Sequence, residues 1–195
     1  MKEDRYEIIM SGSGGQGIIM AAIILAEAVG VYDGKHVCQS QSYGPEARGG
    51  TSKAEVIISN QAIDYPKAIQ PDLLLAMNQE ACDTYSSDLK TEGLLLVDAT
   101  LVHQIPTSRV VAIPFTRIAR KDMGKEMVAN MVSLGAVGFL SQLVSIKSLE
   151  KALMARVPKG TEEMNLKALH AGIEAVKEID LENLPPLAID EEEEI

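Results

Sequence analysis

The chain has 195 residues, of which 46% are hydrophobic and 24% charged, and its formal net charge is -10. This size and composition predict one compact domain with a substantial core. The acidic balance argues against a nucleic-acid partner, because non-specific binding needs a positive surface that meets phosphates. The N-terminal residues resemble no signal peptide and no apolar run is long enough to cross a bilayer, so we expect a cytoplasmic protein with no membrane partner.

Short β-rich runs alternate with helical segments, which predicts the α/β class with a sheet between helices. The expected strands are Tyr6–Ser11, His36–Gln41, Lys53–Ser59, Leu73–Met77, Leu94–Asp98 and Arg109–Ile113. The expected helices are Gly17–Val29, Gln79–Leu89, Ile118–Asp122, Met127–Val144, Ser148–Arg156 and Glu162–Ile179, with Ser148 and Thr161 as N-caps. We assign residues 1–180 to a single domain and residues 181–195 to an acidic, flexible tail.

A glycine-rich loop, Ser11–Gly17, lies between the first expected strand and the first expected helix. Unpaired backbone N–H groups at a helix start favour phosphate or another anion. The loop satisfies G-x-G-x-x-G, but no acidic residue ends the second strand, which disfavours a nicotinamide cofactor. Ile18 and Ile19 stand where a Walker A loop needs Lys and Ser/Thr. The alternative is that the glycines serve only a tight turn.

A second loop, Tyr43–Ser52, places Arg48 before Gly49 and Gly50. A guanidinium beside exposed backbone donors and hydroxyl groups suits the recognition of carboxylate or phosphate. The alternative is a surface interaction between Arg48 and Glu46 on a turn.

The segment Asn130–Gly138 combines a polar start with small residues at helical spacing. Gly135 and Ala136 would let another backbone approach closely, either within the domain or at a subunit interface. Asn130 is either a cap or a hydrogen-bonding group for a ligand.

The titratable residues form no catalytic constellation. The three histidines lack the spacing of metal ligands, and the two cysteines, Cys38 and Cys82, are too few for an iron–sulfur cluster and are best explained as buried apolar groups. Asp64, Asp72 and Asp98 flank expected strands and are explained as turn or strand-end residues. We therefore expect no catalytic residue and no metal site here, which favours a ligand-binding partner of a catalytic subunit.

The motifs taken together closely resemble the gamma subunit of 2-oxoacid:ferredoxin oxidoreductases. They occur in order as Gly12–Gly17, Ser42–Ser52, Pro71-Asp72, Asn130–Ala136 and Asn165–Leu169, and the resemblance extends from Tyr6 to about Ile179. It implies a three-layer α/β/α sandwich with a mostly parallel or mixed sheet.

In that family the enzyme oxidatively decarboxylates a 2-oxoacid, transfers the acyl group to coenzyme A and passes electrons to ferredoxin or flavodoxin. The resemblance implies that thiamine diphosphate lies in alpha and beta partner subunits and iron–sulfur clusters in a ferredoxin-like subunit, while this chain contacts coenzyme A as co-substrate and is inactive alone. The implied contacts are Gly14, Gly15, Gln16, Gly17, Tyr43, Arg48, Gly49, Ser52 and Asn130.

The resemblance favours 2-oxoglutarate as the substrate, with pyruvate and branched-chain 2-oxoacids as alternatives. Two other classes of function stay open. One is an independent nucleotide- or coenzyme A-binding module, and the other is a structural assembly subunit whose loops pack against a partner.

Overall fold

The computed structural model describes residues 5–43, 51–107, 109–181 and 184, and this part of the chain forms one six-stranded sheet in the order β2-β3-β1-β4-β5-β6. The strands are β1 (Arg5–Ser13), β2 (His36–Tyr43), β3 (Thr51–Ser59), β4 (Leu73–Ala76), β5 (Leu94–Asp98) and β6 (Val110–Ile113). β1, β4, β5 and β6 run parallel, whereas β3 pairs antiparallel with both β1 and β2. The sheet is therefore mixed, as expected.

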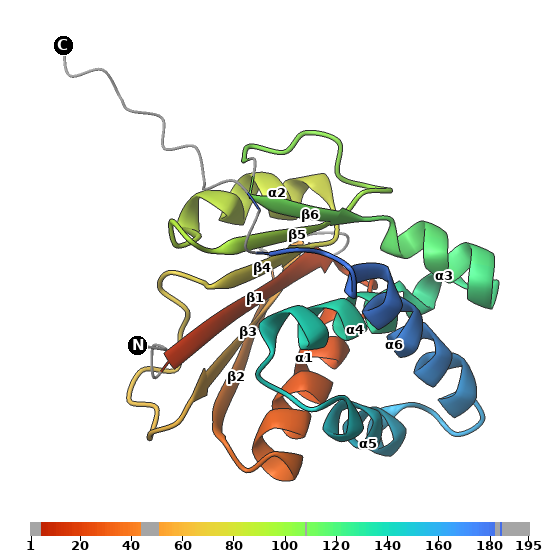
Figure 1. Ribbon diagram of the computed structural model, residues 1–195, viewed down its shortest axis with the longest axis horizontal. Helices are drawn as coiled ribbons and strands as arrows, with labels where there is room; N and C mark the ends of the chain where they lie inside the picture. The colour runs from red at the N-terminus through yellow and green to blue at the C-terminus, as the bar shows by residue number, and fades with distance from the viewer. Residues whose placement is uncertain (1–4, 44–50, 108, 182–183, 185–195) are drawn as a thin grey trace.

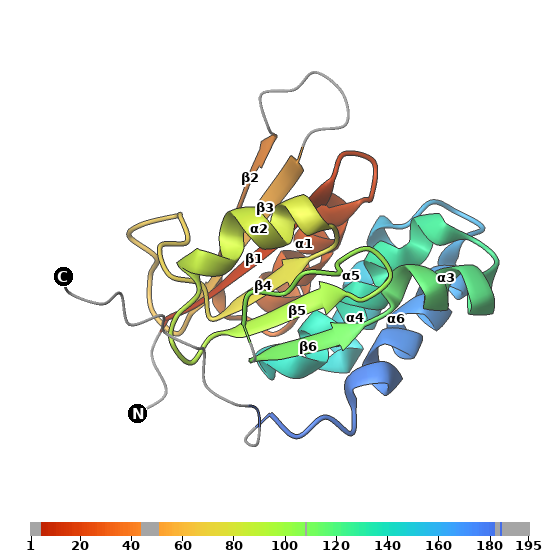
Figure 2. The same cartoon turned by 90° about the horizontal axis from the view of Figure 1, so that it is seen from above.

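Helices cover the two faces of the sheet unequally (Figures 1 and 2). The helices α1 (Ile18–Glu27), α4 (Ala129–Ser141), α5 (Ile146–Arg156) and α6 (Glu162–Val176) lie on one face, and α2 (Gln79–Tyr85) lies on the other. Helix α3 (Phe115–Met123) follows β6, and the short turns η1 (Ala28–Tyr32), η2 (Ser86–Asp88) and η3 (Glu126–Val128) extend or precede helices. The expected three-layer α/β/α architecture is confirmed.

The larger core lies between the sheet and the four-helix face, where α4 and α6 approach unusually closely. A Cβ atom added at Gly135 would lie 2.0 Å from the carbonyl oxygen of Leu169, and one at Gly172 would lie 1.8 Å from that of Val132. These glycines let two backbones of the same chain touch. The close approach expected at Gly135 thus occurs within the domain.

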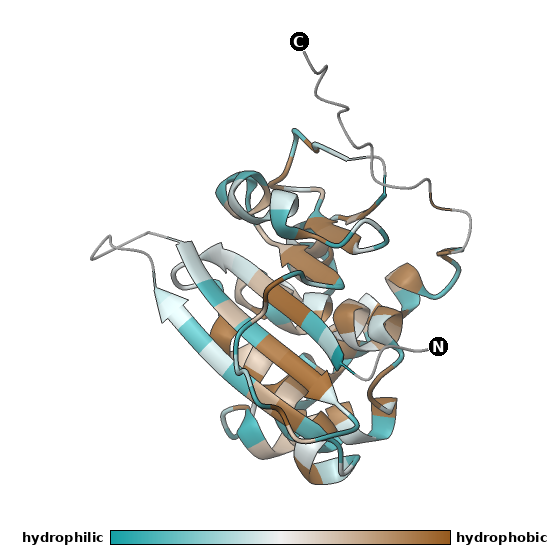
Figure 3. Ribbon diagram, turned by 90° about the vertical axis from the view of Figure 1, so that its left-hand side faces the viewer, coloured by the Kyte–Doolittle hydropathy of each residue, from teal (hydrophilic) through white to brown (hydrophobic). Residues whose placement is uncertain are grey.

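The opposite face of the sheet carries buried charge beside β1 and β3. Glu7 accepts hydrogen bonds from Arg5 Nε at 2.6 Å and from the backbone N–H groups of Ile69 and Gln70. Glu55 forms ion pairs with Lys53 at 2.8 Å and Lys67 at 3.2 Å. Figure 3 shows hydrophilic residues interrupting the apolar runs of the strands. Polar contacts thus replace helix packing over this part of the sheet.

Several helix boundaries differ from the sequence expectation. The N-cap of α5 is Ser145, whose hydroxyl accepts from Ser148 N–H, so the prediction of Ser148 as the cap was wrong by one turn. Thr161 occupies the N-cap position of α6, but its hydroxyl donates to the Pro158 carbonyl and does not cap the helix. Helix α3 begins at Phe115 because Asp98 accepts hydrogen bonds from the backbone and side chain of Thr116.

Cys82 is buried as expected, but Cys38 on the edge strand β2 is only half-buried, which corrects the expectation for that residue. Most of the expected tail lies outside the described residues. Its two described residues, Leu181 and Leu184, pack against the larger core, and Arg109 donates a hydrogen bond to the Leu184 carbonyl.

Candidate functional site

The glycine loop between β1 and α1 presents backbone to solvent at the end of the central strand. Gly14 and Gly15 are exposed, and Gly15 has a φ of 91° with no described atom within 4 Å of its added Cβ position. Gly17 occupies the N-cap position of α1 with a φ of 74°, and among the described residues no side chain caps this helix. The N–H groups of the first turn therefore lie beside an open glycine turn, which suits an anion.

The side chain of Gln16 fixes this loop to the neighbouring strand end. Its Oε1 accepts from Ser13 N–H at 2.7 Å, and its Nε2 donates to the Met77 carbonyl at 3.3 Å. Asn78 adds a second tie, because its amide donates to the Ser13 hydroxyl while its Oδ1 caps α2. Gln16 was predicted as a ligand contact, whereas in the structure its amide is bonded within the chain.

The antiparallel register brings the glycine loop and the loop after β2 to the same end of neighbouring strands. Gly12 on β1 pairs with Ser52 on β3, and Ser52 pairs with Tyr43 on β2. The buried Ser52 hydroxyl donates to the Gly12 carbonyl at 3.2 Å, so it joins the strands, whereas Tyr43 is 69% exposed. Arg48 and Gly49, which were also expected contacts, lie outside the described residues.

Asn130 lies in the first turn of α4, against the glycine loop. Its Nδ2 donates to the Gly17 carbonyl at 3.1 Å, and a Cβ atom at Gly17 would lie 2.4 Å from that nitrogen. The N-cap position of α4 is Val128, so Asn130 is not the cap. Its amide group ties the start of α1 to the start of α4.

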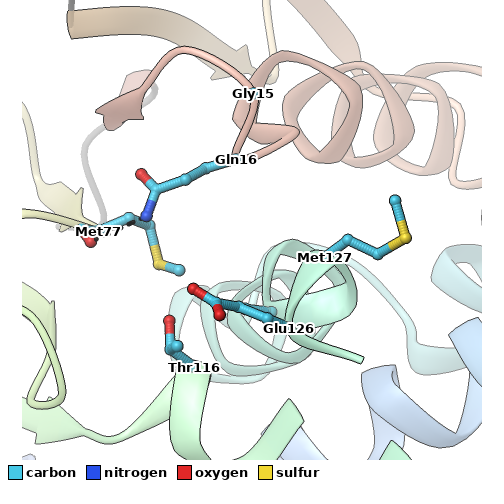
Figure 4. A pocket seen from close by; sticks show the side chains of 7 residues that line it. Gly15, Gln16, Met77, Thr116, Glu126 and Met127 are labelled. Carbon is cyan, nitrogen blue, oxygen red and sulfur yellow. Dashed lines mark hydrogen bonds between the residues drawn. The ribbon is translucent and has the colours of Figure 1, made fainter. Parts of the chain in front are cut away.

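A pocket of about 260 Å³ opens beside the loop and is lined by Gly15, Gln16, Met77, Thr116, Glu126, Met127 and Ala129. In Figure 4, Gln16 points toward Met77, and Thr116 lies near Glu126 on the opposite wall. A second depression of about 220 Å³ shares Met127 with the first and is lined largely by apolar side chains, including Met20, Met131 and Met164. Met127 is 72% exposed and lines both hollows.

Asn78, Thr116 and Met127, which lie beside the glycine loop, were not predicted from the sequence. Asn78 carried a usable signal, because Asn directly after an apolar strand and before a helix is a typical N-cap. Thr116 and Met127 carried none, since only the fold brings them to the pocket that Gly15 and Gln16 also line.

The acidic residues near the strand ends have structural partners, as expected for Asp72 and Asp98. Asp72 accepts from Glu7 N–H at 2.7 Å and pairs with Lys90 at 2.8 Å. Asp98 is fully buried and accepts from Thr100 N–H and from Thr116. Within the described residues, no group of three or more His, Cys, Asp or Glu side chains could hold a metal ion, and no helix is long and apolar enough to cross a membrane.

The sequence model of the pyruvate ferredoxin/flavodoxin oxidoreductase family matches residues 7–175. The 2-oxoglutarate synthase subunit KorC of Methanocaldococcus jannaschii is 51% identical over 179 residues, which cover 90% of this chain and 96% of that protein. A crystal structure of the gamma subunit of a keto/oxoacid ferredoxin oxidoreductase from Geobacter sulfurreducens matches with a TM-score of 0.82 and 50% identity, covering 89% of this chain and 97% of that one.

A third neighbour is a 2-oxoglutarate:ferredoxin oxidoreductase from Magnetococcus marinus, described with 2-oxoglutarate, coenzyme A and succinyl-CoA bound. It matches with a TM-score of 0.78 and 25% identity over 92% of this chain, which spans only 32% of that longer chain. Both the sequence and the fold therefore show that the chain belongs to the pyruvate ferredoxin/flavodoxin oxidoreductase family and is a gamma subunit of a 2-oxoacid:ferredoxin oxidoreductase.

Proposed function

We propose that this gamma subunit receives coenzyme A at the edge formed by the glycine loop and the ends of β2 and β3, in an enzyme that acts on 2-oxoglutarate. The observation that carries the proposal is the start of α1, which no described side chain caps, beside exposed Gly14 and Gly15. Phosphate groups match such a helix start, because its N–H groups and dipole favour negative charge. The coenzyme A bound in the Magnetococcus enzyme supports this choice of ligand.

The side chains at the proposed site have two different roles. Gln16, Ser52 and Asn130 hold the backbone of the loop through hydrogen bonds within the chain. Exposed Gly15 and Tyr43 offer contact surface, and Arg48 supplies the guanidinium expected to pair with phosphate. The loop thus binds anions mainly with backbone donors, while the side chains of Gln16, Ser52 and Asn130 fix its conformation.

The reaction proposed for the assembled enzyme converts 2-oxoglutarate and coenzyme A to succinyl-CoA and carbon dioxide, with two electrons passed to ferredoxin or flavodoxin. Thiamine diphosphate, held by alpha and beta partners, supplies the decarboxylation chemistry, and a ferredoxin-like partner carries iron–sulfur clusters. This chain contributes binding and orientation of the thiol co-substrate and is inactive alone. The cytoplasmic location expected from the sequence stays a prediction.

The choice of 2-oxoglutarate follows the name of the 51% identical relative from Methanocaldococcus. Pyruvate is the alternative, because the matching family model carries that name. The test is kcat/KM of the purified complex for 2-oxoglutarate, pyruvate and a branched-chain 2-oxoacid. The proposal requires 2-oxoglutarate to be preferred, and a preference for either of the others contradicts it.

The coenzyme A proposal is tested with Arg48→Ala in the assembled complex. Loss of a charge-assisted hydrogen bond costs about 1.5–3 kcal/mol, so KM for coenzyme A should rise roughly tenfold to a hundredfold while KM for the 2-oxoacid is unchanged. Lys147→Ala is the matched control, since it removes one exposed cation from the first turn of α5. An unchanged KM for coenzyme A contradicts the proposal, and weakened assembly with normal KM points to a structural loop.

A further inference from the structure

The edge strand β2 is eight residues long and lies at one margin of the sheet (Figures 1 and 2). Every residue of β2 is at least partly exposed, and its register with β3 runs without interruption from His36 to Tyr43. Within the described chain, β3 is its only strand partner. The Ser40 carbonyl already accepts a hydrogen bond from Gln39 Nε2 at 3.1 Å, and the outer backbone groups of β2 are otherwise available to another strand.

Proteins protect such edges with charged side chains, proline, bulges or short strands. The opposite edge of the sheet, β6, has only four residues. In contrast, β2 reads His-Val-Cys-Gln-Ser-Gln-Ser-Tyr, with no proline and with no Asp, Glu, Lys or Arg. An edge of this length, with no proline or charge in the strand itself, is a site for strand addition.

We propose that β2 pairs antiparallel with β2 of a second copy of this chain, which joins two sheets into one across a two-fold axis. The pairing of identical strands in this way requires an axis perpendicular to the sheet, so both helix layers lie on the same side. Residues directly opposite each other must then share a face. This geometry requires a self-complementary strand, and β2 itself carries no carboxylate or ammonium group. The Lys67 ammonium group, which donates to the Ser40 hydroxyl at 3.2 Å, is neutralised by its ion pair with Glu55.

A register centred on Ser40 fits the side chains of β2. It places Val37 opposite Tyr43 of the second copy and Gln39 opposite Gln41, all on the face that α1 covers. Aromatic with β-branched pairs and amide with amide pairs are favourable across antiparallel strands. On the other face, Cys38 lies opposite Ser42 of the second copy. A register centred on Gln39 instead sets Val37 against Gln41, which is a poorer match.

Helix α1 leaves room for a second copy of the chain to approach β2. Helix α1 packs mainly on β3, one strand in from the margin, and contacts β2 less. Strands lie about 4.8 Å apart, so β3 of the two copies would be separated by roughly 14 Å, more than the 8–10 Å at which helices pack. The two α1 helices therefore do not collide.

The proposed register makes a disulfide test possible with one substitution. Opposed Cα atoms in an antiparallel pair lie about 4.5–5.5 Å apart, within the range of a disulfide bond. In Ser42→Cys, the new thiol faces the native Cys38 of the second copy, so mild oxidation should convert the full-length chain to a covalent dimer. The matched control, Ser42→Cys with Cys38→Ser, should stay uncrosslinked, and crosslinking of both or neither variant contradicts the register.

Charge placement provides a second test, by light scattering of the full-length chain after gel filtration. The unchanged chain should have the mass of two copies. The pair Gln39→Lys with Gln41→Lys sets lysines opposite each other and should give one copy, whereas Gln39→Glu with Gln41→Lys sets opposite charges together and should restore two. A monomeric unchanged chain, or equal behaviour of the two double variants, overturns the proposal.

The same crosslink should join two copies of this chain within the purified oxidoreductase. If Cys38 and the cysteine at position 42 stay reduced there while the isolated chain crosslinks, a different subunit covers β2 in the complex, and the second copy is not its partner. The pairing and the proposed coenzyme A site share Tyr43, which the double-lysine variant leaves unchanged. A normal KM for coenzyme A in the double-lysine variant therefore leaves the proposed function intact even where the dimer is lost.

Discussion

The two faces of the sheet are stabilised in different ways. On the face covered by α1, α4, α5 and α6, apolar side chains and touching backbones fill the space, as at Gly135 and Gly172. On the other face, beside β1 and β3, buried Glu7 and Glu55 are held by ion pairs and backbone donors. The first face should respond to changes in volume, and the second to changes in charge and pH.

The largest expected effect is that of Gly172→Ala on the packed face. The added methyl group would meet the Val132 carbonyl, a backbone atom that cannot rotate away, so we expect the free energy of unfolding to fall by about 3 kcal/mol. Urea denaturation measures this loss. Gly138→Ala is the control, because the atoms nearest to its methyl group belong to the side chains of Leu149 and Val144 and not to the backbone. Equal effects of the two variants would contradict backbone contact as the cause.

The next effect concerns the charged face, where Glu7→Gln keeps the shape and removes the charge. Glutamine has one acceptor oxygen and would turn its NH₂ group toward Arg5 or toward the N–H groups of Ile69 and Gln70. An unsatisfied buried group costs about 1–3 kcal/mol. We expect a loss of about 2 kcal/mol in urea denaturation, against almost none for the exposed control Glu92→Gln. Similar values for both would show that the Glu7 network adds nothing.

The pH dependence of stability sharpens the comparison at Glu55. Burial acts to raise the pKa of Glu55, but hydrogen bonds from Lys53 and Ser40 and the charge of Lys53 outweigh it, so the pKa is lowered. A carboxyl whose pKa is lowered by folding stabilises above its unfolded pKa, and this stabilisation is lost as pH falls through the folded value.

Glu55→Gln should therefore lose less stability than the unchanged protein when pH is lowered from about 7 to about 3. Thermal denaturation across that range measures how steeply stability changes with pH. The exposed Glu92→Gln serves again as the control and should follow the unchanged protein. If stability changes with pH equally in Glu55→Gln and in the unchanged protein, Glu55 does not contribute to the pH dependence.

The last prediction concerns the reactivity of the Cys82 thiol, on the buried side of α2. Burial, with a contribution from the Asp83 charge, raises the pKa of Cys82 to about 11. About one Cys82 thiol in a thousand is then ionised at about pH 8, and only the thiolate reacts. A disulfide reagent should modify half-buried Cys38 first and Cys82 much later, as mass spectrometry of the labelled peptides would show. Equal rates would contradict a closed core beneath α2.

The sequence predicted the fold class and the strands well because hydrophobic patterning is local. Strand β5 illustrates this, since its apolar run marks it directly. Strand β1 continues to Ser13, two residues past its predicted end, because Gly12 and Ser13 still pair with β3. The ties of Gln16 to Met77 and of Asn130 to Gly17 could not be predicted, because they join residues distant in sequence. The cap of α5 was misplaced because Ser145 and Ser148 are equivalent in sequence, whereas only Ser145 has an extended backbone.

The central claim is that coenzyme A binds at the glycine-loop edge of this subunit. Hydrogen exchange of the assembled oxidoreductase, with and without coenzyme A, tests it most directly. The account predicts slower exchange in Ser13–Ile18 and at Tyr43 and Thr51, while the start of α5, at the other end of α1, is unchanged. Unchanged exchange at the glycine loop, in a complex that still turns over coenzyme A, would contradict the claim.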